Sequence, residues 1–350
     1  QAAAGGGHQR GAGAGATGPG DAGAAFPHPH ADGLRIQDLR EFCIDALREQ
    51  RVMLDLRADL PEWIIERLRP RWADEEIYAL GRALQQPAPL DLRVNTLRTD
   101  RDAVLQALTK DGLKAEPTPY SPVGIRVHGR PALNRHPLFL DGSIEVQDEG
   151  SQLLGFLLAP RRHELVVDFC AGAGGKSLML GAMMNSQGRL YAFDVSAARL
   201  ARLKPRLARS GLSNLHPHAI RDEHDTKVKR LAGKIDRVLV DAPCSGLGTL
   251  RRNPDLKWRQ LPAALAELTA KQAAILRAAA GLVKAGGRLV YATCSVLAEE
   301  NQDIVDAFLA QQPAFEVVAA GEALAEQRIP LVDDDRYLQL KPHVHGTDGF

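Results

Sequence analysis

The stretch "ELVVDFCAGAGGKSL", Glu164 to Leu178, decides the fold class, because it joins a short apolar run to a glycine-rich turn and then to a helical pattern. The glycines permit a tight turn and let the backbone approach a ligand closely. Lys176 would open the helix, whose N-terminal amides favour an anionic group. Many nucleotide-binding proteins share such a turn, and it also occurs as a plain tight turn. The stretch alone therefore does not identify a ligand.

The same alternation of apolar runs and helical segments continues through the second half of the chain. The runs are "ELVVDF", "GRLYAFDV", "IDRVLVDA" and "GRLVYATC", and amphipathic stretches such as "ARLARLKPRLARSG" separate them. This pattern predicts an α/β, Rossmann-like domain over residues 146–350, with a mostly parallel sheet and helices on both faces. Ligands of such sheets bind beyond the carboxyl ends of the strands. We therefore expect the chemistry where each run stops.

Acidic residues follow two of the predicted strands. Asp194 ends the second run, roughly twenty residues after the glycine turn, a position from which a carboxylate reaches ribose hydroxyls. Asp222 follows a third predicted strand and could face an adenine amino group, although "RDEHD" also fits a solvated loop. Both a dinucleotide and S-adenosylmethionine fit these positions. A dehydrogenase is less favoured, because the turn is not GxGxxG and the next strand ends carry cysteines.

Two cysteines stand where the next two apolar runs end, Cys244 in "DAPCSGLG" and Cys294 in "YATCS". The intervening proline blocks helix continuation, which keeps Asp241 and Cys244 at the ligand crevice. Adjacent parallel strands lie about 4.8 Å apart, so thiols at neighbouring strand ends can face one bound substrate. We interpret this pair as chemical, whereas Cys43 and Cys170, taken singly, fit small buried residues.

Two thiols suit the methylation of a carbon such as C5 of cytosine, which is a poor nucleophile. A thiolate that adds to C6 makes C5 enamine-like, so that C5 can take up a methyl group. A base then removes the C5 proton and the thiol is eliminated. One cysteine suffices as the nucleophile, and a second can assist the release.

The composition is typical of a soluble globular protein, with 45% hydrophobic residues and 44 basic residues against 43 acidic ones. The net charge of +1 does not exclude a nucleic-acid partner, because a local basic face can serve an anion. No run approaches the roughly 18 apolar residues of a spanning helix, and no signal peptide is evident, which predicts a cytoplasmic protein without a membrane partner. The cysteine and histidine spacings predict neither disulfides nor a metal site.

Three segments precede the predicted sheet domain. Residues 1–33 are rich in Gly, Ala and Pro, which predicts a disordered tail. Residues 34–86 show helical periodicity that a proline interrupts. Residues 87–145 predict a small α+β, RRM-like module. An RNA-handling role for this module depends on its Arg93 and Asn95, and a plain packing module is the alternative.

Five segments carry a resemblance to a known family: "LRVNTLR", "VQDEGSQL", "DFCAGAGGKSL", "DAPCSGLGTLRRNPDLKW" and "YATCSVLAEEN". From about Leu92 to the end, the chain resembles the Sun/Fmu (RsmB-like, NSUN-related) family of RNA cytosine-5 methyltransferases. The resemblance implies an enzyme that uses S-adenosyl-L-methionine to make 5-methylcytosine in RNA, with rRNA as the expected substrate and tRNA as an alternative. It also implies that Cys294 is the nucleophile and that Cys244 assists release.

The resemblance further implies a set of site residues. The catalytic residues are Cys294, Cys244, Asp241 and Lys176. The cofactor-binding residues are Cys170, Ala171, Gly172, Ala173, Gly174, Gly175, Lys176, Asp194, Asp222 and Asp241. The residues that match the family's substrate side are Arg251, Arg252, Asp255 and Trp258. Clustered Arg, Lys257 and Trp258 suit phosphate contact and stacking.

The chain departs from the family pattern in three places. Ala173 stands where the family commonly has Pro, and residues 34–86 are shorter than the family's helical RNA-binding domain of antitermination-factor type. The family's last strand normally begins at "TDGF", so we expect a sheet that lacks this strand. A non-catalytic RNA-binding ribosome assembly factor is the rival function, and the intact Cys244 and Cys294 argue against it. A monomer is favoured.

Overall fold

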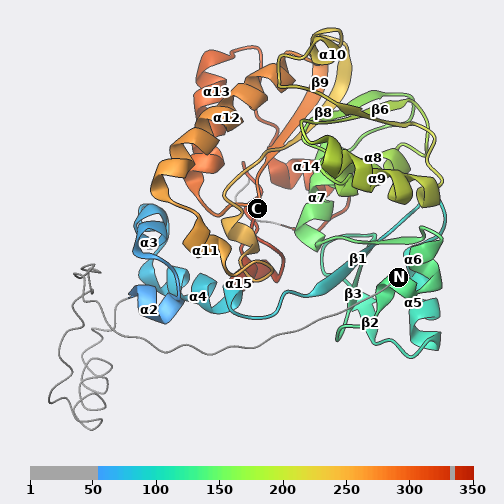
Figure 1. Ribbon diagram of the computed structural model, residues 1–350, viewed down its shortest axis with the longest axis horizontal. Coiled ribbons are helices and arrows are strands. Elements are labelled where there is room, and N and C mark those ends of the chain that lie inside the picture. The colour runs from blue at the N-terminus through green and yellow to red at the C-terminus, as the bar shows by residue number, and fades with distance from the viewer. Residues whose placement is uncertain (1–53, 332–335) are drawn as a thin grey trace, which may run out of the picture. The chain divides into compact units, whose positions relative to one another are not determined.

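A five-stranded parallel sheet carries the strand ends at which the site residues were expected. The computed structural model describes residues 54–331 and 336–350 (Figure 1). The strands, in the spatial order β7-β6-β5-β8-β9, are β5 (Leu165–Asp168), β6 (Arg189–Asp194), β7 (Leu215–Ala219), β8 (Ile235–Asp241) and β9 (Val283–Ala292). All four pairings are parallel, which confirms the predicted sheet. The strand order reverses beside β5, and a ligand crevice lies at such a switch point.

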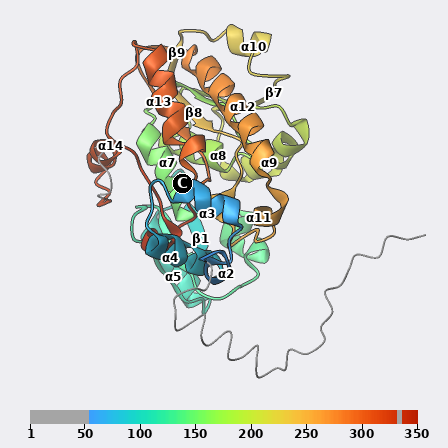
Figure 2. The same ribbon diagram turned by 90° about the vertical axis from the view of Figure 1, so that its left-hand side faces the viewer.

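Helices cover both faces of this sheet, as predicted. The helices are α7 (Glu149–Leu158), α8 (Gly175–Met183), α9 (Ala197–Ser210), α10 (Thr226–Lys229), α12 (Pro262–Ala280) and α13 (Gln302–Gln311). Val166 of β5 packs in one core cluster with α7, α8 and α9, whereas Val167 packs in another with α10 and α12. Helix α13 lies beside α12 in both views (Figures 1 and 2). Alternate residues of one strand thus contribute to two separate cores.

A smaller antiparallel sheet precedes the parallel one. Its strands, in the order β2-β3-β1-β4, are β1 (Leu90–Val94), β2 (Ala115–Pro117), β3 (Gly124–Val127) and β4 (Ile144–Val146). Helix α5 (Arg101–Lys110) begins after Asp100, whose side chain accepts the backbone N–H of Ala103 at 2.9 Å. Residues 90–146 thus contain both strands and a helix, in keeping with the α+β pattern of their sequence. The domain boundaries stay predictions.

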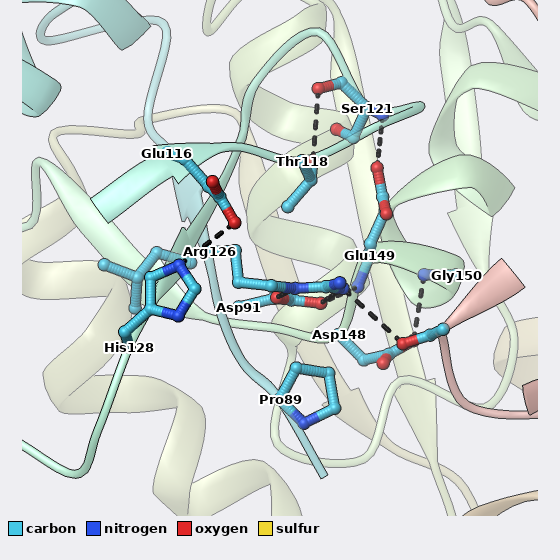
Figure 3. A network of polar contacts seen from close by, with 12 residues as sticks. Pro89, Asp91, Glu116, Thr118, Ser121, Arg126, His128, Asp148, Glu149 and Gly150 are labelled. Atoms are coloured by element: carbon cyan, nitrogen blue, oxygen red, sulfur yellow. Dashed lines mark hydrogen bonds and ion pairs between the residues drawn. The ribbon is translucent and has the colours of Figure 1, made fainter. Parts of the chain in front are cut away.

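A buried polar network joins the small sheet to α7 (Figure 3). Asp91 accepts two hydrogen bonds from the Arg126 guanidinium, at 2.8 and 3.0 Å. The fully buried Glu149 accepts the backbone N–H of Ser121 at 2.7 Å. Asp148 accepts the backbone N–H groups at the start of α7. Buried carboxylates of this kind require such partners, so the network fixes the small sheet against α7.

Three short helices near the start of the described chain pack onto the loops that follow β8 and β9. They are α2 (Leu54–Ala58), α3 (Glu62–Leu68) and α4 (Asp74–Leu84). Ile64, Leu68 and Leu80 share a core cluster with Leu247 and Leu297. The helical prediction holds for this part of residues 34–86. Residues 34–53, the predicted tail 1–33 and Cys43 lie outside the described residues.

Candidate active site

The two cysteine thiols meet at the carboxyl ends of β8 and β9. These strands pair with Asp241 opposite Ala292, so the segments that follow them start side by side. The Sγ atoms of Cys244 and Cys294 lie 3.4 Å apart, and both residues are partly exposed. The structure therefore brings the two cysteines together, as their positions in the sequence predicted.

Lys176 and Asp241 form an ion pair across the crevice, with Nζ and Oδ2 2.8 Å apart. Burial by itself favours the neutral amine, but the Asp241 carboxylate outweighs it, so that the pKa of Lys176 is raised. Negative charge on the Cys294 sulfur also raises this pKa. Lys176 therefore connects the glycine turn to the thiols.

Phe350 is a site residue that the sequence reading missed. The Lys176 ammonium lies 5.5 Å from the centre of its ring, within the range of a cation–π contact. The backbone of Gly349 donates to the Gly248 carbonyl at 2.9 Å, which fixes this segment against the loop after β8. A Cβ on Gly248 would lie 2.2 Å from the Gly349 oxygen, so the approach requires glycine there. The sequence "TDGF" at residues 347–350 contains Phe350, but no hydrophobic periodicity in the sequence indicates that this segment contacts Lys176.

The glycine turn has the geometry that its sequence predicted. Gly172 and Gly174 have φ values of +56° and +78°, a region that side chains disfavour. A Cβ on Gly174 would lie 2.3 Å from Leu203 Cδ1, whereas open space faces Gly172. Arg206 donates to the Ala173 carbonyl at 2.7 Å. The turn is therefore held from its far side while Gly172 stays accessible.

Asp194 lies at the end of β6, directly beside the turn. Its buried carboxylate accepts the backbone N–H groups of Gly172 at 2.8 Å and Ser196 at 2.7 Å, and the Arg199 guanidinium at 2.9 Å. The predicted neighbourhood of Asp194 and the turn is present. Asp222 is exposed in the loop after β7, where it accepts the His224 N–H at 2.9 Å. Its two interpretations, adenine contact and solvated loop, stay open.

Asp168, which ends β5, is a buried carboxylate with an unused oxygen. Its Oδ2 accepts the Ser177 hydroxyl at 2.6 Å, whereas Oδ1 has no hydrogen-bond partner among the described residues. Burial raises the pKa of Asp168 to about 7. Burial also raises the pKa of the nearby Cys170 thiol, which keeps that thiol neutral. Oδ1 is thus an acceptor that a ligand's N–H donor can satisfy.

Both arginines after the Pro-Cys motif form ion pairs: the Arg251 side chain is buried and does not fit the predicted phosphate contact, whereas Arg252 stays partly exposed and its phosphate contact stays a prediction. Asp348 accepts Arg251 Nε at 2.9 Å and Arg252 Nε at 2.6 Å, and Asp148 accepts Arg252 Nη2 at 3.1 Å. These ion pairs use both guanidinium groups to hold the C-terminal segment. Trp258 is 64% exposed and stays available for stacking.

The described residues include no group of three His, Cys, Asp or Glu side chains that could hold a metal ion. Within the same residues, no helix is both long and apolar enough to cross a bilayer.

A parallel sheet with a glycine turn after its first strand, an acidic residue after its second and two facing thiols defines a Rossmann-like methyltransferase. Residues 155–350 match the family described as 16S rRNA methyltransferase RsmB/F, and residues 60–134 match the ferredoxin-like domain of the RsmF/B-like methyltransferases. The chain belongs to the RsmB/F family.

Individual relatives agree with this assignment. The chain is 35% identical to probable ribosomal RNA small subunit methyltransferase B of Synechocystis, over 90% of this chain and 71% of that protein. It is 34% identical to the Bacillus subtilis protein of the same name, over 87% of this chain and 68% of that one. The chain is therefore an RNA methyltransferase that uses S-adenosyl-L-methionine, and not a dehydrogenase.

Two solved structures from Pyrococcus horikoshii share the fold. A methyltransferase homologue protein superposes with a TM-score of 0.71 at 27% identity, over 85% of this chain and 95% of that one. NSun6 with SFG, an analogue of S-adenosyl-L-methionine, superposes with a TM-score of 0.72 at 20% identity, over 83% of this chain and 96% of that one. At this identity the second likeness shows the fold alone.

Proposed function

We propose that this protein methylates C5 of a cytosine in ribosomal RNA, with Cys294 as the nucleophile and Cys244 assisting release. The observation that carries the proposal is the 3.4 Å contact between the two thiols beside the Lys176–Asp241 ion pair. The names of the relatives, small-subunit rRNA methyltransferases, support rRNA as the substrate.

The reaction that this arrangement supports has four steps. Cys294 Sγ bonds to C6 of the cytosine, and the electron pair of the C5–C6 double bond moves toward C5. C5 then takes the methyl group of the bound cofactor, a sulfonium whose methyl is electrophilic, and the neutral thioether leaves. A base removes the C5 proton, and the S–C6 bond breaks as the C5–C6 double bond returns. The product is 5-methylcytosine with Cys294 restored.

The electrostatics of the pair support these roles. The hydrogen bond with Cys294 and burial raise the pKa of the Cys244 thiol well above its usual range, so Cys244 stays protonated at neutral pH. The Cys244 thiol lies 3.4 Å from the Cys294 sulfur, and negative charge on that sulfur raises the pKa of Lys176. A thiol that stays protonated is a poor nucleophile, which leaves the attack on C6 to Cys294. Cys244 is the better proton carrier.

The residues around the turn fit the methyl donor. The carboxylate of Asp194 would bind the ribose hydroxyls beside the Gly172 backbone, where open space faces the turn. The unused Oδ1 of Asp168 would accept the amino group of the methionine end, a donor that the buried oxygen otherwise lacks. Asp222 would lie on the adenine side.

The test compares wild type, Cys294→Ala and Cys244→Ala with an unmodified small-subunit rRNA transcript and S-adenosyl-L-methionine. We expect Cys244→Ala to retain RNA as a covalent adduct on a denaturing gel, because release is impaired, and Cys294→Ala to form none. The double variant controls for other nucleophiles. An adduct only with Cys294→Ala would reverse the roles, and methylation of tRNA but not of the transcript would change the substrate. If no form bound RNA covalently or transferred a methyl group, the assembly-factor alternative would replace the proposal.

A further inference from the structure

Two consecutive side chains, Glu300 and Asn301, hydrogen-bond to residues that flank the two thiols, Glu300 partly through Gln272. Glu300 ends the short 3-10 helix η3 (Ala298–Glu300), and Asn301 follows it directly before α13. The hydroxyl of Tyr291 donates to the Glu300 carbonyl at 2.8 Å, which fixes this backbone against β9. The mechanism proposed above gives neither side chain a role.

Glu300 holds the Cys244 side. Its carboxylate is fully buried and accepts the backbone N–H of Ser245 at 2.8 Å and the Ser245 hydroxyl at 2.5 Å. Gln272 Nε2 donates to Glu300 at 3.0 Å and to the Pro243 carbonyl at 2.9 Å. The residues immediately before and after Cys244 therefore belong to one hydrogen-bonded group.

Asn301 holds the Cys294 side in the same way. Its Oδ1 accepts the Thr293 hydroxyl at 2.6 Å, and its Nδ2 donates to the Ser295 carbonyl at 2.9 Å and the Leu297 carbonyl at 2.9 Å. The residues immediately before and after Cys294 are thus fixed by one amide. Because Glu300 and Asn301 are adjacent in the chain, one short backbone segment holds both loops.

The chemistry of the Glu300 site favours a role in positioning over simple packing. The hydrogen-bond partners of this buried carboxylate, Ser245 and Gln272, are neutral, and an apolar residue would avoid the cost of burying the group. The hydroxyl oxygens of Ser245 and Ser295 lie 3.2 Å apart, which joins the two loops directly. Besides the hydrogen bond to Cys294 and burial, the Glu300 charge helps to raise the pKa of Cys244.

We propose that Glu300 and Asn301 are the positioning residues of the thiol pair. Glu300 places the Cys244 thiol for release, and Asn301 places the Cys294 sulfur for attack on C6. This assignment rests on the proposed function. It predicts that substitution of Glu300 slows the release of RNA, whereas substitution of Asn301 slows the formation of the adduct.

The experiment measures covalent RNA adducts and methyl transfer in Glu300→Ala and Asn301→Ala, with the rRNA transcript and S-adenosyl-L-methionine. Glu300→Ala should accumulate an adduct although Cys244 is present, with a lifetime at least about tenfold longer than in wild type, since a positioned acid or base contributes roughly 10²–10⁴-fold. Asn301→Ala should form at least about tenfold less adduct. Glu299→Gln, which alters the neighbouring, partly exposed pair with Arg67, is the matched control and should behave as wild type.

Cys244→Ala, run in parallel, separates the two proposals. If it forms no adduct, the proposed function fails. If it forms one while Glu300→Ala releases RNA as fast as wild type, or while both positioning variants show the same defect, the positioning roles are wrong. The affinity for S-adenosyl-L-methionine, measured by calorimetry, should be the same in Glu300→Ala and Asn301→Ala as in wild type. If Glu300→Ala does not fold, Glu300→Gln decides, because it keeps the side-chain shape and one acceptor oxygen for Ser245.

Discussion

The two halves of the crevice are built in different ways. The cofactor side, which comprises the turn from Cys170 to Lys176 together with Asp194, is made from backbone groups, positive φ angles and one anchored carboxylate. The thiol side, which comprises Cys244, Cys294, Asp241 and their supports, is made from side chains of distant segments. A turn is encoded within a few residues. The thiol pair depends on contacts among residues that lie far apart in the sequence, after β8, after β9 and directly before α13.

This difference indicates where substitutions act. A change on the cofactor side distorts a local conformation and should alter affinity and stability. A change on the thiol side leaves the fold largely intact and should alter the chemical step. Lys176 belongs to both sides, because it lies in the first turn of α8 and pairs with Asp241.

Lys176→Met gives the largest expected effect. It removes the cation that pairs with Asp241 and interacts electrostatically with the Cys294 sulfur. We expect methyl transfer at saturating cofactor to fall by about 10²–10³-fold, the scale of a lost electrostatic contact at a reacting centre. Single-turnover transfer of labelled methyl groups to the rRNA transcript measures this effect.

A matched variant tests whether this loss is specific. Lys284→Met removes another lysine that pairs with an aspartate, Asp236, near the amino ends of the same two strands. It should leave the rate unchanged. If additional cofactor restored the methyl-transfer rate of Lys176→Met to that of wild type, Lys176 would act only in cofactor binding and not at the thiols.

The sequence predicted the cofactor side better than the thiol side, for a physical reason. The strand, turn and helix around Gly172 follow from local periodicity and glycine, and Cys244 and Cys294 could be placed at neighbouring strand ends. Phe350 depends on a long-range return of the chain, which periodicity does not encode. For Arg251 the sequence predicted an exposed, phosphate-binding side chain, whereas the structure shows it buried against Asp348. A cluster of basic residues in a sequence does not reveal the distant carboxylates that pair with it.

The cofactor side can be tested by comparing two glycines with positive φ. Alanine at Gly172 should cost about 1–2 kcal/mol of folding free energy through backbone strain alone. Gly174→Ala should cost at least about 1 kcal/mol more, because its Cβ would overlap Leu203, and overpacking adds roughly 1–3 kcal/mol. Urea unfolding without cofactor measures both losses. Gly112→Ala, also at positive φ with open space around it, is the control for strain. Equal losses at all three glycines would show that the contact with Leu203 carries no cost.

The smallest expected effect concerns the pH dependence of cofactor affinity. Burial raises the pKa of Asp168 to about 7, so the free protein holds this carboxyl protonated below that pH. An amino group bound at the unused Oδ1 would favour the ionised form. Affinity for S-adenosyl-L-methionine should therefore increase as the pH rises from about 5.5 to 7.5, by at most about tenfold per pH unit, with release of a proton.

Calorimetry in buffers of different ionisation enthalpy measures both the affinity and the released proton. Asp168→Asn has no proton to release, so its affinity should be weaker at pH 7.5 and independent of pH over this range. The sign is decisive, because a carboxyl with a raised pKa loses its proton when a cationic donor binds and gains one when an anion binds. Proton uptake on binding would therefore show that the amino end of the cofactor does not contact Asp168, and that the cofactor side recognises the methionine end through the turn alone.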